Sequence, residues 1–165
     1  MSLVVKFCNK FDEKRADDYD RLYELTSSVK KNYPHYRDWF YGIFLEGLKK
    51  NERTIVSVFN EKSLAGVALL EHSEEENKIN TLFVLPDYRC KGVGSLLMKE
   101  SIDVLGGSEI NITVSGENLS KLKNLLDTSG FKLMKIEKDF YVKGEEEYFY
   151  QIPKKPNVKR SFKIK

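Results

Sequence analysis

The chain has 165 residues, a formal net charge of +3 and 41% hydrophobic residues, a composition typical of one soluble globular domain. No apolar run approaches the roughly 20 residues of a membrane-spanning helix, and the N-terminus lacks the charged and apolar regions of a secretory signal. We therefore expect a cytoplasmic protein without membrane association. Cys8, Cys90, His35 and His72 show no metal-ligand spacing, so we expect neither a disulfide framework nor a metal site.

Basic residues gather at the C-terminal end. Residues 154–165 contain six lysines and arginines and no acid, so removing these six from +3 leaves −3 for the rest of the chain. A short terminal run of one charge is usually solvated, and nothing elsewhere interleaves basic with aromatic residues as a nucleic-acid surface does. We interpret residues 1–153 as one domain and residues 154–165 as a flexible basic tail, and we expect no nucleic-acid partner.

The hydrophobic pattern predicts a strand, two helices and three antiparallel strands in the first half of the chain. These elements span residues 3–7, 17–31, 36–50, 54–59, 65–72 and 79–85. The second half predicts a helix, a strand, a helix and two closing strands. The first of these helices begins near Gly92 and ends at Gly106-Gly107, and Asn118 is placed to cap the second, which ends at Gly130. The three strands span residues 109–114, 131–136 and 147–152.

A basic glycine loop, Arg89-Cys90-Lys91-Gly92-Val93-Gly94, separates the strand at 79–85 from the helix that follows. A helix N-terminus presents unpaired N–H groups and the positive end of the helix dipole, and the two glycines let a ligand approach closely. Because Arg89 and Lys91 add positive charge, the loop is suited to a phosphate or pyrophosphate. Leu97 replaces the third glycine of a dinucleotide fingerprint, and the Gly-Lys-Ser/Thr of a P-loop is absent.

The Arg-x-x-Gly-x-Gly pattern at residues 89–94, behind a strand ending in Val84-Leu85-Pro86, resembles the acetyl-CoA loop of the GCN5-related N-acetyltransferase (GNAT) superfamily. The expected order of strands and helices resembles that of the same family over nearly the whole chain. The resemblance implies an α/β (α+β) fold, with one domain whose central mixed, mostly antiparallel sheet has about seven strands and about four flanking helices. It also implies acetyl-CoA as co-substrate, without a metal.

The resemblance further implies which residues bind acetyl-CoA. Phe83, Val84 and Leu85 would contact the acetyl and pantetheine end. Asn118 would bond the pantetheine or phosphate arm, and it could cap its helix at the same time. The loop residues that would wrap the pyrophosphate are Arg89, Cys90, Lys91, Gly92, Val93, Gly94 and Ser95.

The segment between the first two helices is rich in aromatic residues. One interpretation is a core face packed on the sheet, which suits Trp39, Phe40, Ile43 and Phe44. The other is an acceptor pocket, because members of the family commonly place this segment against the acceptor. On the second interpretation the acceptor-binding residues are Tyr33, His35, Tyr36 and Tyr41.

Two positions that often carry catalytic groups in the family hold other residues here. Many relatives have a tyrosine that protonates the leaving thiolate where this chain has Leu126, and some have a glutamate base where it has Lys78. General acid–base help is worth about 10²–10⁴ in rate, so substitutes are expected. The candidates are Glu71 and His72 at a strand end and Tyr148 in the closing hairpin; an exposed strand-end group or a core tyrosine is the alternative interpretation.

The sequence therefore predicts an acetyl-CoA-dependent N-acetyltransferase, an acyltransferase in which an acceptor amine attacks the bound thioester directly. The acceptor would be a small-molecule amine or a peptide amine, and the fold alone does not determine which of the two is the substrate. Two alternatives stay open: a non-catalytic acyl-CoA-binding module, and an acetyltransferase acting on an RNA- or protein-linked amine. Dimers are common in the family, so the resemblance also allows a homodimer.

Overall fold

The computed structural model describes residues 1–28, 30 and 33–154. In this part of the chain seven strands form one sheet in the order β1-β2-β3-β4-β5-β7-β6. The strands are β1 (Leu3–Cys8), β2 (Arg53–Asn60), β3 (Ser63–His72), β4 (Asn77–Val84), β5 (Ile110–Ser115), β6 (Lys132–Lys138) and β7 (Glu146–Ile152). The predicted basic tail lies outside the described residues from position 155 onwards.

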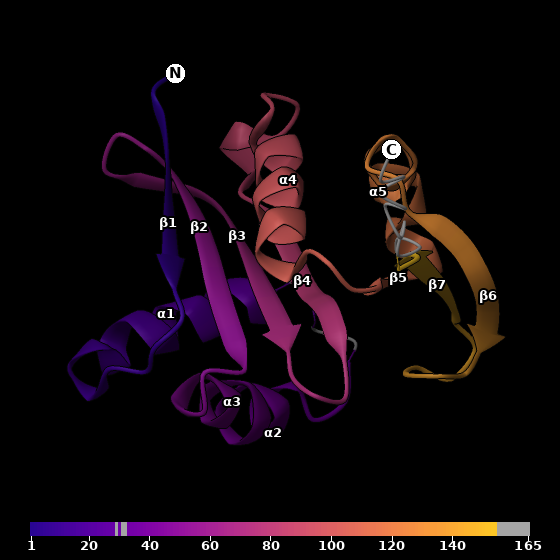
Figure 1. Ribbon diagram of the computed structural model, residues 1–165, viewed down its shortest axis with the longest axis horizontal. Helices are drawn as coiled ribbons and strands as arrows, with labels where there is room; N and C mark the ends of the chain where they lie inside the picture. Colours follow the sequence, from indigo (N-terminus) through magenta and orange to yellow (C-terminus); the bar gives the residue numbers. More distant parts are fainter. Residues whose placement is uncertain (29, 31–32, 155–165) are drawn as a thin grey trace, which may run out of the picture.

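Helices cover both faces of this sheet (Figure 1). Helices α4 (Val93–Leu105) and α5 (Gly116–Thr128) pack on one face, where their apolar side chains join those of β2 to β5 in one buried cluster. The opposite face is covered by α1 (Ala16–Ser27), α2 (Tyr36–Trp39) and α3 (Leu45–Lys49). Among the described residues this second cluster takes its buried strand residues from β2 and β3 alone. In the part of the chain that the structure describes, no helix therefore covers the same face of β5 and β7.

All neighbouring strands pair antiparallel except β4 and β5, which are parallel. A parallel pair needs a crossover connection, and here α4 supplies it. Figure 1 shows β5, β7 and β6 standing apart from the first four strands, on the far side of α4. The predicted fold class and the predicted order of elements are confirmed.

The structure differs from the prediction in the second helix and in one helix cap. The helix expected over residues 36–50 contains a π-helical stretch, Phe40–Phe44, between α2 and α3. Its i→i+5 bonding keeps Phe40 and Phe44 stacked at 5.9 Å in the core. Ser115 rather than Asn118 precedes the first turn of α5.

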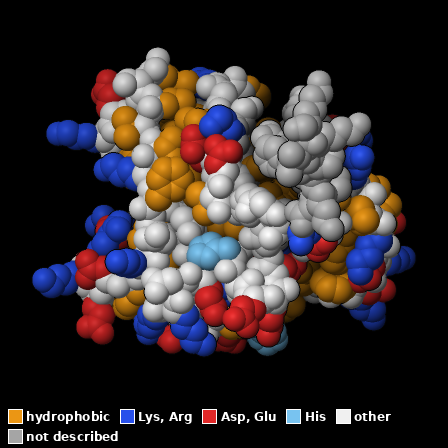
Figure 2. Space-filling model, viewed as in Figure 1, with side chains coloured by type: hydrophobic (Ala, Val, Ile, Leu, Met, Phe, Trp, Pro, Cys, Tyr) orange, Lys and Arg blue, Asp and Glu red, His pale blue; other side chains and the backbone are white. Residues whose placement is uncertain are grey.

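Charged side chains of both signs are interspersed over the face drawn in Figure 2, as on an ordinary solvated surface. Within the residues that the structure describes, every helix is too short or too polar to cross a membrane.

Candidate active site

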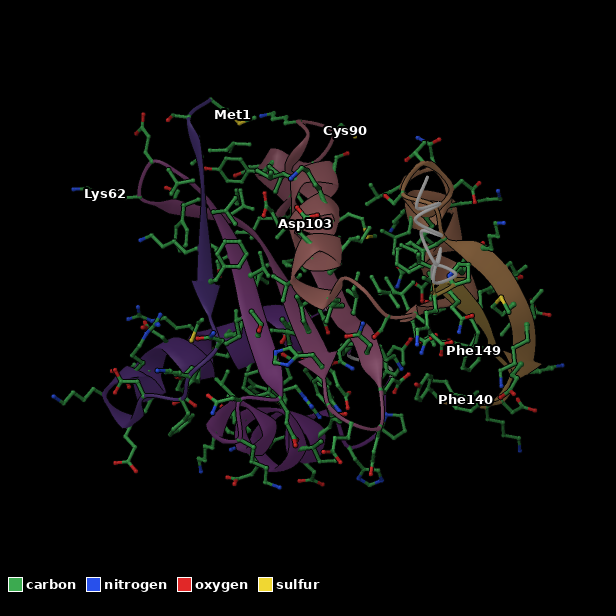
Figure 3. All side chains as sticks on the ribbon, viewed as in Figure 1. Met1, Lys62, Cys90, Asp103, Phe140 and Phe149 are labelled. Carbon is green, nitrogen blue, oxygen red and sulfur yellow. The ribbon has the colours of Figure 1, made fainter. Side chains whose placement is uncertain are left out.

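The basic glycine loop has the geometry that the sequence predicts for an anion site. Gly92 precedes α4 with a φ of 84°, in the left-handed region that favours glycine. Arg89 folds back on the loop, where its Nε donates to the Val84 carbonyl oxygen at 3.1 Å. Figure 3 shows Cys90 at this loop, beside the start of α4. The N-terminus of a 13-residue helix therefore opens beside two basic residues, Arg89 and Lys91.

A groove of about 630 Å³ runs from this loop between β4 and α5. Its apolar wall comes from the end of β4 and from α5, and its polar end lies at the loop. The lining residues are Ser28, Leu82, Phe83, Val84, Pro86, Arg89, Cys90, Gly94, Glu117, Asn118, Lys121, Leu122 and Leu125.

Six of the residues predicted to bind acetyl-CoA line this groove. They are Phe83, Val84, Arg89, Cys90, Gly94 and Asn118. Asn118 also donates from Nδ2 to Ser115 Oγ at 3.2 Å, which holds its side chain at the start of α5. Of the remaining predicted residues, Leu85 follows β4 directly. Lys91 and Gly92 lie in the loop, and Val93 and Ser95 lie in the first turn of α4.

Two of these residues, Leu85 and Val93, have groups that are already engaged within the protein and cannot contact a ligand. The Leu85 N–H donates to the Ala65 carbonyl oxygen at 2.9 Å, so this amide is occupied within the sheet. The Val93 side chain is fully buried in the core, so only its backbone faces the loop.

Strands β4 and β5 separate after two residue pairs. Lys78 pairs with Asn111 and Ile79 with Ile112, and the described parts of the two strands pair no further. The β4 backbone beyond Ile79 therefore faces an opening between the two halves of the sheet.

A β-bulge in β4 lies at the point of separation. Leu70 of β3 pairs with Ile79 and Leu69 pairs with Thr81, so Asn80 is an extra residue. A bulge bends its strand, increases its twist and is common beside active sites. Asn80 Oδ1 and Thr81 Oγ1 are both buried, and neither has a hydrogen-bond partner within the described chain. Unpartnered buried polar atoms are costly, so they indicate where a ligand or water is bound.

A small cavity of about 50 Å³ lies at this opening. Leu82, Asn118 and Leu122 line both the cavity and the groove, so the two adjoin. The other lining residues come from β4, β5 and the segment after α1: Lys30, Tyr33, Ile79, Asn80, Thr81, Ile112, Thr113, Val114 and Ser115.

A buried carboxylate, Glu147 of β7, lies next to two residues that line the cavity: it accepts a hydrogen bond from Tyr33 and is paired with Ser115 across the sheet. Only 4% of this residue is exposed. The Tyr33 hydroxyl, which comes from the segment between α1 and α2, donates to Glu147 Oε1 at 3.1 Å and to Oε2 at 3.3 Å. Lys30 places its Nζ 4.5 Å from the centre of the Tyr33 ring. Two parts of the chain that are distant in sequence, the segment after α1 and strand β7, therefore bring an acid, a phenol and an amine together.

Burial shifts the pKa of all three groups. It raises the pKa of Glu147, and this rise is opposed by the Tyr33 hydroxyl, by the neighbouring Thr113 hydroxyl and by Lys30 and Lys78. Burial and the adjacent carboxylate raise the pKa of Tyr33, which keeps the phenol protonated. Burial lowers the pKa of Lys30 to about 8, although the charge of Glu147 acts in the opposite direction. Perturbed pKa values of this kind are typical of functional sites.

Of the four predicted acceptor-binding residues, the structure brings Tyr33 to the cavity. His35 lies on the surface with 83% of its side chain exposed, near Asp38. Tyr36 packs in the core below α1 and donates its hydroxyl to Thr26 Oγ1 at 2.7 Å. Tyr41 donates its hydroxyl to Asp20 at 2.5 Å on the exposed side of α1.

The three predicted catalytic residues are placed outside the groove and the cavity as far as the described residues define them. Glu71 Oε1 lies 3.3 Å from Nη2 of the buried Arg53. His72 Nε2 is 2.9 Å from Thr54 Oγ1 at the same sheet end. Tyr148 projects on the α5 face of β7 and donates to Glu146 Oε2 at 2.9 Å.

Glu147 and Lys30 were missed by the sequence analysis. One sequence feature could have drawn attention to Glu147. Side chains alternate between the two faces of β7, so Tyr148 and Tyr150 lie on the α5 side and Glu147 lies on the other side. Glu147 stood at the predicted strand start, where a carboxylate is expected to be solvated. The pattern of β4 and β5 gives no sign that the strands separate, so nothing in the sequence placed Glu147 at a cavity.

The turn of α5 that often supplies a proton donor in relatives is apolar here. Leu126 is fully buried in the core, and the neighbouring Leu125 faces the groove. This turn therefore offers no side-chain proton donor for a thiolate leaving group. Tyr33 at the adjoining cavity carries a proton, because its pKa is raised.

The residues present suit acetyl-CoA. Leu82, Val84, Leu122 and Leu125 offer an apolar channel for pantetheine, and the loop before α4 offers amides and positive charge for a pyrophosphate. The unpartnered polar atoms at the bulge lie where the channel meets the cavity. The arrangement can hold a thioester at the opening of the sheet while an amine approaches from the side of Glu147.

Known proteins resemble the chain in sequence and in structure. Residues 16–120 match the model of the acetyltransferase (GNAT) family. An N-alpha-acetyltransferase of Sulfurisphaera tokodaii is 24% identical over 156 residues, which cover 84% of this chain and 89% of that protein. The crystal structure of the NatC complex bound to Gag peptide and CoA matches with a TM-score of 0.72 and 21% identity, over 94% of this chain and 100% of that one. The ribosomal-protein-S18-alanine N-acetyltransferase of Escherichia coli matches with a TM-score of 0.70 and 16% identity, over 98% and 100% of the two chains.

The family match covers more than half of the chain, and it agrees with the loop, the groove and the separated strands. This chain belongs to the GNAT acetyltransferase family and is an acetyl-CoA-dependent N-acetyltransferase.

Proposed function

We propose that this enzyme acetylates the α-amine of a peptide or protein, and that Glu147 accepts the proton that the amine loses. The buried pair of Tyr33 and Glu147 at the opening between β4 and β5 carries the proposal. A raised pKa makes a carboxylate a better base near neutral pH. The cavity beside it adjoins the groove suited to acetyl-CoA, so the amine and the thioester would meet there.

The face of β5 and β7 without a helix over it supports a peptide acceptor. It carries the polar side chains of Asn111 and Gln151, which are joined by a 3.0 Å hydrogen bond, in addition to Thr113 and Glu147. A peptide backbone needs such polar partners, whereas a small amine does not need an extended surface.

Aromatic side chains form one continuous row beside this face, because Tyr141 also packs against its neighbour Phe140 with 4.5 Å between ring centroids. The Tyr33 ring contacts Tyr141 of the β6–β7 connection at 5.1 Å between centroids. Phe140 packs edge to face against Phe149 at 5.0 Å, and both lie at the same end of the β6–β7 hairpin in Figure 3. We infer that an N-terminal peptide passes along this aromatic row to reach Glu147.

The similar proteins support the same acceptor class. The Sulfurisphaera tokodaii relative is an N-alpha-acetyltransferase, and the NatC structure contains a Gag peptide in addition to CoA. The Escherichia coli structure is an alanine N-acetyltransferase of ribosomal protein S18. We extend their common substrate, an α-amine on a polypeptide, to this chain.

In the proposed reaction the enzyme mainly positions the thioester and deprotonates the acceptor amine. Glu147 takes a proton from the acceptor ammonium, and the neutral amine then attacks the thioester carbonyl carbon. The β4 backbone beyond Ile79 would hold the acetyl oxygen, and the loop before α4 would hold the pyrophosphate. Tyr33 orients Glu147 through its hydroxyl.

The acceptor class is tested by thiol release from acetyl-CoA with three acceptors. The first is a lysine-free peptide with a free α-amine, the second is a peptide with a formylated N-terminus and an internal lysine, and the third is a polyamine. We expect release of CoA over many turnovers, in excess of the enzyme, with the first peptide alone. Equal release with the blocked lysine peptide or with the polyamine would overturn the proposed acceptor.

A further inference from the structure

Lys30 brings a lysine side chain to the wall of the cavity where acetyl transfer is proposed, with its amine over the ring of Tyr33, which lines the same cavity. It lines the cavity together with Asn80, Thr81 and Leu82 of β4, the strand that would hold the thioester. Lys30 is half-buried, in contrast to the exposed Lys62 in the β2–β3 turn, which Figure 3 shows far from the cavity.

The backbone at Lys30 is fixed to the rest of the protein. Its N–H donates to the Thr26 carbonyl oxygen at 3.1 Å, which continues the bonding of α1, and its carbonyl accepts from the Tyr33 N–H at 2.8 Å. The Nζ atom lies over the Tyr33 ring, and the same ring carries the hydroxyl that binds Glu147. The amine is therefore held near the carboxylate that we propose as the base.

We propose that Lys30 is an acetyl acceptor of its own enzyme, which it acetylates intramolecularly when acetyl-CoA is bound and the peptide acceptor is absent. This inference rests on the proposed function, because it uses the same cavity and the same base. It assigns Lys30 as a modification site within the acceptor pocket.

The surroundings of Lys30 favour the neutral, nucleophilic amine. Its pKa is lowered to about 8, mainly by burial; Lys78 of β4 acts in the same direction and Glu147 of β7 acts against it. Compared with a lysine at 10.5, this raises the neutral fraction near pH 7.5 by about two orders of magnitude. Only the neutral amine can attack a thioester.

The step is balanced by groups in the cavity and by the co-substrate. A C–N bond forms between Lys30 Nζ and the acetyl carbonyl carbon, and the C–S bond of the thioester breaks. The sulfur leaves with the bonding electron pair, the amine proton passes to Glu147, and that proton then reaches the thiolate. The products are Nε-acetyl-Lys30 and free CoA.

Acetylation of Lys30 would change the site in two ways. It removes a positive charge that lowers the pKa of Glu147, so that pKa would rise further. It also adds an acetyl group to a cavity of about 50 Å³, where the acceptor amine has to enter. The acetylated enzyme should therefore bind acceptor peptide more weakly.

The test is incubation of the full chain with acetyl-CoA without acceptor, followed by peptide mapping by mass spectrometry over time. We expect acetyl-Lys30 to accumulate at least about tenfold faster than acetyl-Lys62, with a first-order rate that does not depend on protein concentration. Lys30→Arg should remove this modification, whereas the matched Lys62→Arg should leave it intact. A rate at Lys30 equal to or below that at Lys62 in the parent protein would overturn the inference, whether or not the variants fold.

A second measurement does not require turnover. The chain without acetyl-CoA is treated with an N-hydroxysuccinimide acetate reagent, in the presence and absence of CoA. CoA should protect Lys30 and leave Lys62 unchanged, and lack of protection at Lys30 would contradict its place beside the thioester.

The two proposals fail in different ways. If the free-α-amine peptide is acetylated and Lys30 is not modified, the Lys30 proposal is overturned and the proposed peptide acceptor stands. Modification of Lys30 without acetylation of any peptide overturns the proposed acceptor and leaves Lys30 as a site.

Discussion

Tyr33 and Glu147 lie 114 residues apart in the sequence, and the Tyr33 hydroxyl donates to both oxygens of the Glu147 carboxylate. The bond ties the segment between α1 and α2 to β7 across the opening where β4 and β5 separate. It also fixes the orientation of Glu147, the only acid among the described residues that is buried. The pair explains how a site without the tyrosine and glutamate positions common in the family could still move protons.

Replacing Tyr33 by phenylalanine should move the acidic limb of the pH–rate profile. The hydroxyl stabilises the carboxylate and lowers the pKa of Glu147, so its loss raises that pKa. Because the base must be ionised, activity should then appear at higher pH, with a shift on the order of one pH unit for one hydrogen bond. The measurement is kcat/KM for a free-α-amine peptide across pH.

Tyr19→Phe is the matched control, because the Tyr19 hydroxyl accepts from the Asp12 N–H away from the cavity. Its profile should coincide with that of the parent protein. A Tyr33→Phe profile with no shift, or a shift to lower pH, would contradict the role of the pair.

Gly94 allows a direct test of the groove. A Cβ atom at this position would lie 3.6 Å from Val84 Cγ2 and 3.7 Å from Leu125 Cδ2, so alanine fits without movement. The larger branches of valine would extend into the groove that Gly94 lines. Gly94→Val should weaken acetyl-CoA binding about tenfold or more, and Gly94→Ala should not, as measured by calorimetric titration.

The thermal midpoint separates binding from folding in these variants. Alanine in the first turn of α4 should raise it slightly, since glycine costs about 0.5–1 kcal/mol in a helix. Equal acetyl-CoA affinity in the Gly94→Ala and Gly94→Val variants would show that acetyl-CoA does not bind in the groove beside Gly94.

Glu71 gives a test of the catalytic residues predicted from sequence. Its carboxylate faces the buried Arg53 at 3.3 Å, so Glu71→Gln leaves a buried positive charge without its counter-ion. We expect a loss of about 2–3 kcal/mol in the free energy of unfolding by urea, with kcat/KM unchanged. The exposed pair of Lys49 and Glu46 is the comparison, and Glu46→Gln should cost less than about 0.5 kcal/mol.

The opposite result for Glu71 would be equally clear. A large fall in kcat/KM with unchanged stability would support the sequence-based assignment and weaken the case for Glu147.

The fold and the position of the glycine loop could be predicted because both depend on local patterns, whereas phosphate binding by that loop stays a prediction. The apolar period of each strand and helix is visible in the residues themselves. Gly92 needs its positive φ for reasons that act within a few residues, and so the loop before α4 was predicted at its observed place. On the acceptor side, the structure brings Tyr33 to the cavity while Tyr36 packs in the core, and which residues bind the acceptor stays a prediction.

The catalytic candidates could not be chosen from the sequence for a different reason. Whether a strand-end carboxylate is solvated, paired or buried depends on contacts between distant segments. Glu71 finds Arg53, while Glu147 finds Tyr33 and a cavity that exists because β4 and β5 separate. The bulge at Asn80 is one extra residue within a continuous strand sequence. No residue type in that sequence indicates where the bulge occurs.

The most direct test of the account is the pH dependence of kcat/KM for Glu147→Gln, with acetyl-CoA affinity measured on the same protein. Glutamine keeps the size of the side chain and an acceptor for the Tyr33 hydroxyl, but it cannot take a proton. The account predicts a fall of about 10²–10⁴ in kcat/KM, loss of the acidic limb and an unchanged Kd for acetyl-CoA. A variant with parental kcat/KM and the parental pH profile would show that Glu147 is not the base.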